Sequence, residues 1–360
     1  MDYSKAFDTV PHNLLLRKLE MYGVRGTALN LLRSFLLNRT HSTKIENSLS
    51  SPLNLNIGLP QGSNLSPFLF ILFVNDLCNI SNTYEKILFA DDTTFYFTSS
   101  NYGSLIESCN KELDLFYRWS VANRLSINTD KTCYMIFGNR TIPEENRRIN
   151  LNSAEIRQEF SICYLGVLID DKLKFNAHID SICTKISRSL GIIYNIRNNT
   201  PRNCLLMLYH SLIYPYLHYC CLAWGKAFQS HVRRLEILQK RVLRILNFKS
   251  YYEHTTPLFI SNKILRVGDI YNLRLMCYLF NNPRFIEEHR TTHEHETRNR
   301  HNLQPQFQRL AVCQQAISFQ GPRIWNEVPL QIKQSASLVC FKARYKTYLL
   351  SQYSNVPSLD

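Results

Sequence analysis

The first part of the chain alternates between helical and strand-like spacing of its apolar residues. Helical spacing predicts helices from Pro11 to Gly23, over residues 27–38, 66–77 and 104–122, the third burying Phe68, Leu69, Leu72 and Phe73. Alternation predicts hairpins over residues 40–57 and 85–98 and a strand over residues 132–137. This order predicts the α+β class, with an antiparallel sheet covered by helices on one face.

The second part of the chain is mainly helical in its pattern. Helical periodicity dominates from Ala177 to Phe248, after a predicted hairpin at Tyr164. Residues 281–306 are rich in polar residues and proline, which is typical of a linker or mobile loop. The last stretch is expected to form a small unit around Phe319, Trp325, Leu330, Phe341 and Tyr345. A chain of 360 residues is expected to hold more than one structural unit.

Two adjacent carboxylates, Asp91 and Asp92, lie between short apolar runs that are expected to form a hairpin with the acids at its tip. Neighbouring carboxylates repel each other unless a cation lies between them. An ordinary hairpin turn would carry Asp-Gly or Asn-Gly, whereas Asp92 is followed by Thr93. From this segment alone, a metal site and a solvated turn remain equally open.

Other segments change that balance. Five segments in this order resemble motifs A to E of reverse transcriptases, specifically the non-LTR (LINE-like, jockey- and CR1-type) retrotransposon polymerases: Met1–His12, Gly58–Pro67, Leu88–Tyr96, Asn123–Thr132 and Tyr164–Asp170. Each string alone would be a weak signal, but their order within the first 170 residues is specific. The rest of the chain is similar, more loosely, to the thumb and C-terminal region of such elements.

The resemblance implies an RNA-directed DNA polymerase that extends a primer hydroxyl with two Mg²⁺ ions, for which Mn²⁺ can substitute. It implies that Asp2 and Asp91 are catalytic metal ligands and that Asp92 is an accessory acid. Lys131 is implied to contact the triphosphate or to protonate pyrophosphate. Without the other motifs, Asp2 would be an ordinary chain terminus and Lys131 an ordinary surface charge.

Three further residues acquire roles from the resemblance. Phe7 is implied to exclude a ribose 2′-hydroxyl, and Gln61 and Gly62 lie in the loop that approaches the incoming base pair. The ordinary alternatives are core packing for Phe7 and a turn before a helix for Gly62.

The resemblance also implies how the chain is divided. It predicts a palm over residues 1–175, a basic helical thumb over 176–280, a linker or mobile loop over 281–306 and a C-terminal region of unknown role over 307–360. The family's fingers precede motif A, so they are expected to be missing here. Two functions stay open: the polymerase, and an inactive, truncated or repurposed fragment that binds RNA or DNA.

The charge of the chain favours a polyanionic partner, since 42 Lys and Arg face 28 Asp and Glu. Between Thr184 and Ser250 there are eleven basic residues and one acid. On a helix at His231–Leu246 the apolar residues form one arc, and a second arc carries five basic residues: Arg233, Arg234, Lys240, Arg241 and Arg244. A solvated basic face is the usual explanation, but neighbouring aromatic residues favour contact with a template–primer duplex.

The remaining composition excludes several classes. The 11 cysteines fall singly in apolar segments, which predicts reduced, mostly buried thiols and an intracellular protein of the nucleus or cytoplasm. The apolar run from Phe68 to Val74 is far too short for a membrane span. Four histidines lack nearby cysteines and zinc-site spacing, so a polar loop is the better explanation: His289, His293, His295 and His301. The implied partners are an RNA template, a DNA primer, dNTPs and another protein of the element.

Overall fold

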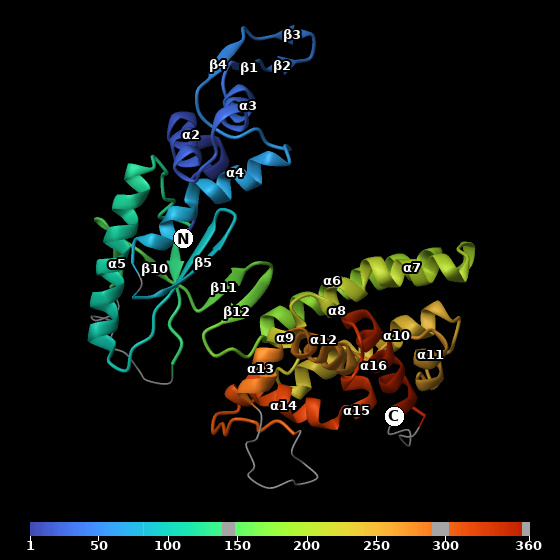
Figure 1. Ribbon diagram of the computed structural model, residues 1–360. Coiled ribbons are helices and arrows are strands. Elements are labelled where there is room, and N and C mark those ends of the chain that lie inside the picture. The colour runs from blue at the N-terminus through green and yellow to red at the C-terminus, as the bar shows by residue number, and fades with distance from the viewer. Residues whose placement is uncertain (82, 139–147, 290–301, 355–360) are drawn as a thin grey trace. The chain divides into compact units, whose positions relative to one another are not determined.

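The computed structural model describes residues 1–81, 83–138, 148–289 and 302–354 (Figure 1). The chain divides into two compact units, Met1–Phe160 and Ser161–Asp360, each with its own apolar core. The boundary between these units falls before the Tyr164 hairpin, and Val167 of that hairpin packs in the core of the second unit. The assignment of palm, thumb and C-terminal region stays a prediction.

The first unit mixes helices with short strands. Its helices are α1 (Ala6–Thr9), α2 (His12–Met21), α3 (Gly26–Leu36), α4 (Leu65–Val74), the 3-10 helix η1 (Asn75–Asn79) and α5 (Tyr102–Ala122). Its strands are β1 (Arg39–His41), β2 (Lys44–Ile45), β3 (Ser48–Leu49), β4 (Leu53–Leu55), β5 (Glu85–Phe89), β6 (Asp92–Tyr96), β7 (Cys133–Tyr134), β8 (Asn150–Leu151), β9 (Ala154–Glu155) and β10 (Arg157–Gln158). The mixed helix and strand content agrees with the expected class.

The sheet of the first unit is less regular than expected. Regular strands in the described residues pair only two by two, and β7 and β10 run parallel. The pairs β1–β4 and β2–β3 form the region predicted as one antiparallel hairpin over residues 40–57, and β5–β6 is the hairpin predicted over residues 85–98. A continuous antiparallel sheet is therefore not formed by these strands, and the segment at the start of the chain is joined to β6 by isolated main-chain hydrogen bonds instead.

Helices α2, α4 and α5 supply nine of the 20 buried residues of the first core. Leu15, Leu19, Phe70, Phe73 and Phe116 are fully buried there. On α4 the structure buries Leu69 and Phe73 as predicted, but Phe68 is exposed. The Lys18 ammonium donates to the Phe73 carbonyl at 2.6 Å and to Asp76 Oδ1 at 2.8 Å, which ties α2 to the end of α4.

The second unit is a helical assembly that follows one hairpin. The hairpin is β11 (Ser161–Tyr164) and β12 (Val167–Asp170). The helices are α6 (Asn176–Ile196), η3 (Arg197–Asn199), α7 (Arg202–Leu212), α8 (Tyr214–His218), α9 (Cys221–Trp224), α10 (Gln229–Leu246), α11 (Thr256–Ser261), α12 (Val267–Asn281), α13 (Pro283–Glu288), η4 (Cys313–Gln315), α14 (Ile317–Glu327), α15 (Leu330–Lys333) and α16 (Leu338–Gln352).

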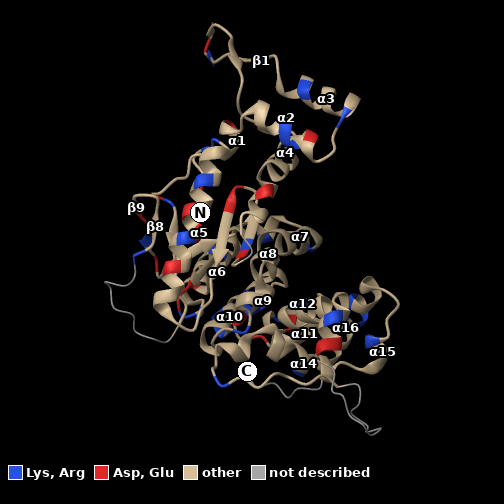
Figure 2. Cartoon of the chain, turned by 60° about the vertical axis from the view of Figure 1, so that its left-hand side comes forward, with Lys and Arg blue, Asp and Glu red and all other residues tan. Residues whose placement is uncertain are grey.

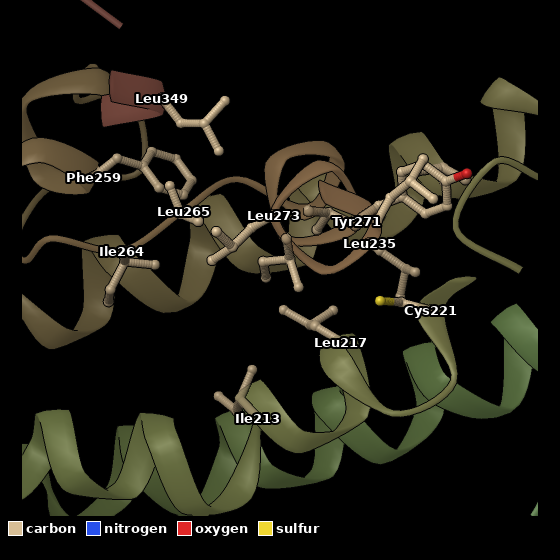
Figure 3. Packing of buried hydrophobic residues seen from close by; sticks show 14 of the residues in the cluster. Ile213, Leu217, Cys221, Leu235, Phe259, Ile264, Leu265, Tyr271, Leu273 and Leu349 are labelled. Atoms are coloured by element: carbon tan, nitrogen blue, oxygen red, sulfur yellow. The ribbon is translucent and has the colours of Figure 1, made fainter. Parts of the chain in front are cut away.

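The core of the second unit is continuous from α6 to α16. Ile213, Leu217, Leu235 and Leu273 converge in it, and Leu349 of α16 belongs to the same cluster (Figure 3). The last helices are thus not a separate small unit. The expected core residues Trp325, Phe341 and Tyr345 are buried, whereas Leu330 is exposed.

A buried amide organises the middle of this unit. Gln239 of α10 is 1% exposed, and its Nε2 donates to the Tyr209 hydroxyl at 3.0 Å and to the Leu265 carbonyl at 2.8 Å. Its Oε1 accepts from the Val267 N–H at 3.1 Å. Because all three bonds are made in the core, the amide fixes α7 and the start of α12 on α10 without leaving an unpaired polar group.

The structure bears on three further expectations from the sequence: the cysteines, the linker and the membrane span. All 11 cysteines are free, but three are buried, Cys109, Cys183 and Cys221, and four are exposed, so the prediction of mostly buried thiols is wrong. Helix α13 occupies part of the expected linker, while His293, His295 and His301 lie outside the described residues. Of the helices in the described ranges, none has the length and apolar character needed to cross a membrane.

Candidate active site

The segment that carries Asp2 is held on both sides by main-chain hydrogen bonds. On one side, the Met1 nitrogen donates to the Thr93 carbonyl at 2.9 Å and the Thr93 N–H donates to the Met1 carbonyl at 3.3 Å. On the other side, the Asn128 N–H donates to the Asp2 carbonyl at 2.9 Å and the Ser4 N–H to the Ser126 carbonyl at 2.8 Å. Residues 1–4 therefore lie between β6 and residues 126–128, as a strand would.

The acid pair lies at the tip of the β5–β6 hairpin, as predicted. Phe89 pairs with Asp92, so Ala90 and Asp91 form a two-residue turn. Ala90 has a φ of +53°, a left-handed conformation that costs a residue with a Cβ about 1–2 kcal/mol. The turn is thus strained where the acids are presented, and strained backbone is concentrated at functional sites.

The exchange of two hydrogen bonds between Met1 and Thr93 is the mark of an antiparallel pair. Continued by one residue, this register sets Asp2 across from Asp92, with Asp91 beyond them in the turn. Opposed carboxylates repel each other unless a cation screens them. Within the described ranges, however, no three His, Cys, Asp or Glu side chains form a ready metal-binding group.

Asp2 has the surroundings of a metal ligand. Its Oδ2 is buried and has no hydrogen-bond donor. The Lys131 ammonium lies 3.7 Å from that oxygen, beyond hydrogen-bond reach, and the Lys131 side chain is 72% exposed. A turn sets this position, because the Asn128 side chain accepts from the Lys131 N–H at 3.2 Å. A carboxylate oxygen that is buried without a donor fits a hard cation such as Mg²⁺.

The loop before α4 is fastened to the segment after Asp2. The Leu59 N–H donates to the Phe7 carbonyl at 2.7 Å, and the Gly58 N–H donates to the Val10 carbonyl at 2.8 Å. Buried His12 bonds the Gly58 carbonyl through Nε2 at 2.7 Å. Gly58 has a φ of +87°, and a Cβ there would lie 2.8 Å from the Asp8 carbonyl oxygen. Only glycine fits this contact, which the sequence analysis did not single out, although the glycine stands at the start of the second motif.

The three residues that were expected at the incoming nucleotide lie near this contact. Phe7 is half-buried, and its ring stacks on Phe70 at 4.7 Å between centroids. Exposed Gln61 donates through Nε2 to Asp8 Oδ1 at 2.9 Å. Gly62 has a φ of +84° but faces open space, so conformation alone requires glycine there. Hydrogen bonds from Leu59 and Gln61 thus join Phe7 and Asp8 of α1 to the loop that carries Gln61 and Gly62.

The basic helix has the amphipathic form that the sequence predicts. On α10 the expected apolar arc is buried except for Leu238, which is half-buried. Arg233 and Arg241 are exposed on the other arc. Figure 2 colours the Lys and Arg residues of the chain blue. Arg234 forms an ion pair with Asp180 of α6, and Arg244 donates through Nε to the Glu253 carbonyl at 2.8 Å.

Residues 1–169 match the family model for reverse transcriptase (RNA-dependent DNA polymerase). These residues are a reverse transcriptase domain. The domain covers the first unit and extends into β12. Its match includes all five segments that carried the resemblance, apart from the last residue of the fifth.

Similar proteins are also found among the polymerases of non-LTR elements. The chain is 30% identical over 280 residues to the RNA-directed DNA polymerase from mobile element jockey of Drosophila melanogaster, covering 75% of the chain and 30% of that protein. It is 27% identical over 281 residues to the probable RNA-directed DNA polymerase from transposon X-element of the same species, covering 76% and 30%. The chain thus spans about a third of the length of these curated relatives.

Proposed function

We propose that the reverse transcriptase domain makes DNA on an RNA template, with Asp2, Asp91 and Asp92 holding two Mg²⁺ ions. The observation that carries this proposal is the buried Asp2 oxygen without a donor, on a segment bonded to the strand that begins at Asp92. Bound there, the ions would activate the primer hydroxyl and stabilise charge on the triphosphate. Three carboxylates provide the hard oxygen donors that Mg²⁺ prefers.

The protein's own groups prepare the site for this reaction. The main-chain bonds of residues 1–4 fix the Asp2 carboxylate relative to the hairpin. Lys131, exposed and ion-paired with Asp2 at 3.7 Å, would turn toward an incoming triphosphate and deliver a proton to the leaving pyrophosphate. Phe7 and Gly62 would line the nucleotide, Phe7 against the 2′ position of the sugar and Gly62 against the base pair, with Gln61 between the loop and Asp8.

The test replaces each acid by its uncharged isostere. Asp2→Asn and Asp91→Asn should each abolish Mn²⁺ binding, measured by calorimetry. They should also abolish primer extension on an RNA template, while the thermal midpoint changes little. Asp130→Asn is the matched control, because Asp130 is an exposed acid next to Lys131. Retention of both ion binding and extension by Asp91→Asn would contradict the catalytic assignment.

A second function, nucleic-acid binding without catalysis, is favoured by the segregated face of α10. Its basic residues neutralise phosphates, so affinity should fall steeply with salt and show little sequence preference. Changing Arg233, Arg234, Lys240, Arg241 and Arg244 together to Gln should flatten the slope of log affinity against log salt, by up to about 0.9 for each duplex phosphate that is no longer neutralised. The contribution of Arg234 should be small, since Asp180 already neutralises it. An unchanged slope would leave this face as a solubilising surface only.

A further inference from the structure

Four large rings lie exposed around the C-terminal end of α10. Tyr194, Phe248, Tyr251 and Tyr252 are 52%, 54%, 68% and 88% exposed. Single exposed apolar residues are common on proteins, but a group of them marks an interaction surface. Cation–π contacts and a ring–ring contact join these rings into groups, which distinguishes them from scattered surface residues.

Two arginines contact the rings in two groups. The Arg197 guanidinium lies 4.4 Å from the Tyr194 ring and 5.8 Å from the Phe248 ring. The Arg244 guanidinium lies 5.8 Å from the Tyr251 ring. Tyr251 and Tyr252 meet edge to face, with centroids 5.3 Å apart. Rings therefore contact guanidinium groups in both groups, and Phe248 of the first group lies three residues before Tyr251 of the second along the chain.

The backbone at Phe248 is strained in order to place its ring there. The Lys249 N–H donates to the Arg244 carbonyl at 2.8 Å and the Phe248 N–H to the Ile245 carbonyl at 3.3 Å, which is the Schellman pattern of a helix end. Phe248 takes the left-handed position of that pattern, with a φ of +55°, where glycine is favoured. A bulky residue is an outlier in this conformation. Because the ring is exposed, burial does not offset the strain.

The charge at this surface is largely uncompensated. Arg202 is bound by two neutral oxygens, Asn247 Oδ1 at 2.7 Å and Asn262 Oδ1 at 3.1 Å. Among the described residues, no carboxylate forms an ion pair with Arg197 or Arg202. The one acid of this loop, Glu253, is paired with Lys249 at 3.1 Å. Rings with uncompensated guanidinium groups complement a strand of phosphates and bases.

We propose that this surface, termed the ring platform, binds single-stranded nucleic acid, with unpaired bases stacked on the rings and phosphates held by the arginines. The platform consists of Tyr194, Arg197, Arg202, Arg244, Phe248, Tyr251 and Tyr252. A single strand is the favoured ligand because stacking on side chains needs the open face of an unpaired base, which a duplex does not offer. The proposal deepens the nucleic-acid binding proposed for α10 and needs no catalysis by the first unit.

The test uses the full chain and fluorescent 12-nucleotide probes: oligo(dT), oligo(rU), an abasic strand of equal charge and a duplex. Phe248→Gly should raise the thermal midpoint, since glycine relieves the strain, and should weaken oligo(dT) or oligo(rU) binding roughly 5- to 150-fold, the range expected when one base no longer stacks. Binding of the abasic strand and the duplex should not change. The two oligomers identify whether DNA or RNA is preferred.

Two further variants make the outcome decisive. Phe248→Leu keeps an apolar side chain without a ring, so it should reduce single-strand affinity as much as glycine does. Phe307→Ala removes a ring that is 84% exposed elsewhere in the second unit and should change nothing. Equal decreases on abasic and base-bearing strands, or full single-strand affinity in Phe248→Leu, would overturn the proposal. If Asp91→Asn kept ion binding and primer extension, the catalytic proposal would be contradicted but the expected oligonucleotide binding would not change. The two proposals can therefore fail independently.

Discussion

The contact between Gly58 and Asp8 predicts a large difference between two glycines of the same loop. In Gly58→Ala the new Cβ would lie 2.8 Å from the Asp8 carbonyl oxygen and 3.2 Å from both the carbonyl carbon and Cα of Asp8, all backbone atoms that cannot rotate away. Overpacking of this kind costs about 1–3 kcal/mol, and the left-handed φ costs about 1–2 kcal/mol more. The stiffer unfolded chain offsets about 0.4–1 kcal/mol. We expect a net decrease of about 2–4 kcal/mol in the free energy of unfolding.

Gly62→Ala is the matched control. Its φ of +84° resembles that of Gly58, but nothing lies within 4 Å of the new Cβ. Only the conformational cost remains, so the decrease should be about 1 kcal/mol. For a unit of this size, Gly58→Ala should lower the unfolding midpoint by roughly 5–15 °C and Gly62→Ala by a few degrees.

The assay must separate the two units, because the chain as a whole need not unfold in one step. Hydrogen exchange followed by mass spectrometry gives the opening free energy for peptides of the first unit, with peptides of the second unit as the internal reference. Gly58→Ala should increase exchange in α2 and in the loop before α4 and leave α6 and α10 unchanged. Equal effects of the two substitutions would refute the argument from the close approach.

Three further predictions follow from single contacts. Phe7→Val should increase the incorporation of ribonucleotides relative to deoxyribonucleotides, measured as the ratio of the two kcat/KM values. Phe70→Leu should disturb the stacked pair and lower the thermal midpoint without changing that ratio. A constant ratio in Phe7→Val would indicate that Phe7 has a packing role only. Ala90→Gly should raise the opening free energy of β5 and β6 by up to about 1 kcal/mol, which slows their hydrogen exchange. Faster exchange would contradict the strain at the turn. Burial raises the pKa of Asp269, although hydrogen bonds from Tyr353 and Asn272 act in the opposite direction. The folded state therefore holds this proton more tightly, and the stability of the native protein relative to Asp269→Asn should decrease as pH rises above about 4. Urea midpoints that diverge in the other direction would refute this sign.

The buried face of a helix could be predicted from the sequence where polar and apolar residues are segregated along it, and could not be predicted where they are not. On α10 the two arcs are distinct, and the structure buries the expected one apart from half-buried Leu238. On α4 nearly every residue is apolar, so periodicity does not define a face, and Phe68 was placed inside by mistake. Burial of Ser66 escaped prediction as well, because its hydroxyl donates to the Pro60 carbonyl at 2.6 Å, a contact set by the loop.

The site divides in the same way. The acid pair at a hairpin tip followed from local pattern, and the structure bears it out at Ala90 and Asp91. The pairing of Met1 with Thr93 is made by main-chain atoms 92 residues apart, and such contacts leave no trace in side-chain pattern. The need for glycine at position 58 likewise depends on the carbonyl of Asp8, 50 residues earlier in the chain, so spacing alone did not distinguish Gly58 from Gly62.

The main-chain hydrogen bonds that hold Asp2, made by Ser4, Thr93 and Asn128 and here called the backbone clamp, have a consequence for how this domain tolerates sequence change. Every residue except proline carries the N–H and carbonyl that these bonds use, so the bonds do not depend on which side chains stand at exposed or half-buried positions such as Ser4 and Asn128. Proline is different at these three positions, because each donates its N–H to the clamp. Mutational drift can therefore alter the surroundings of the acid widely while its position is retained, until a proline removes one of these donors.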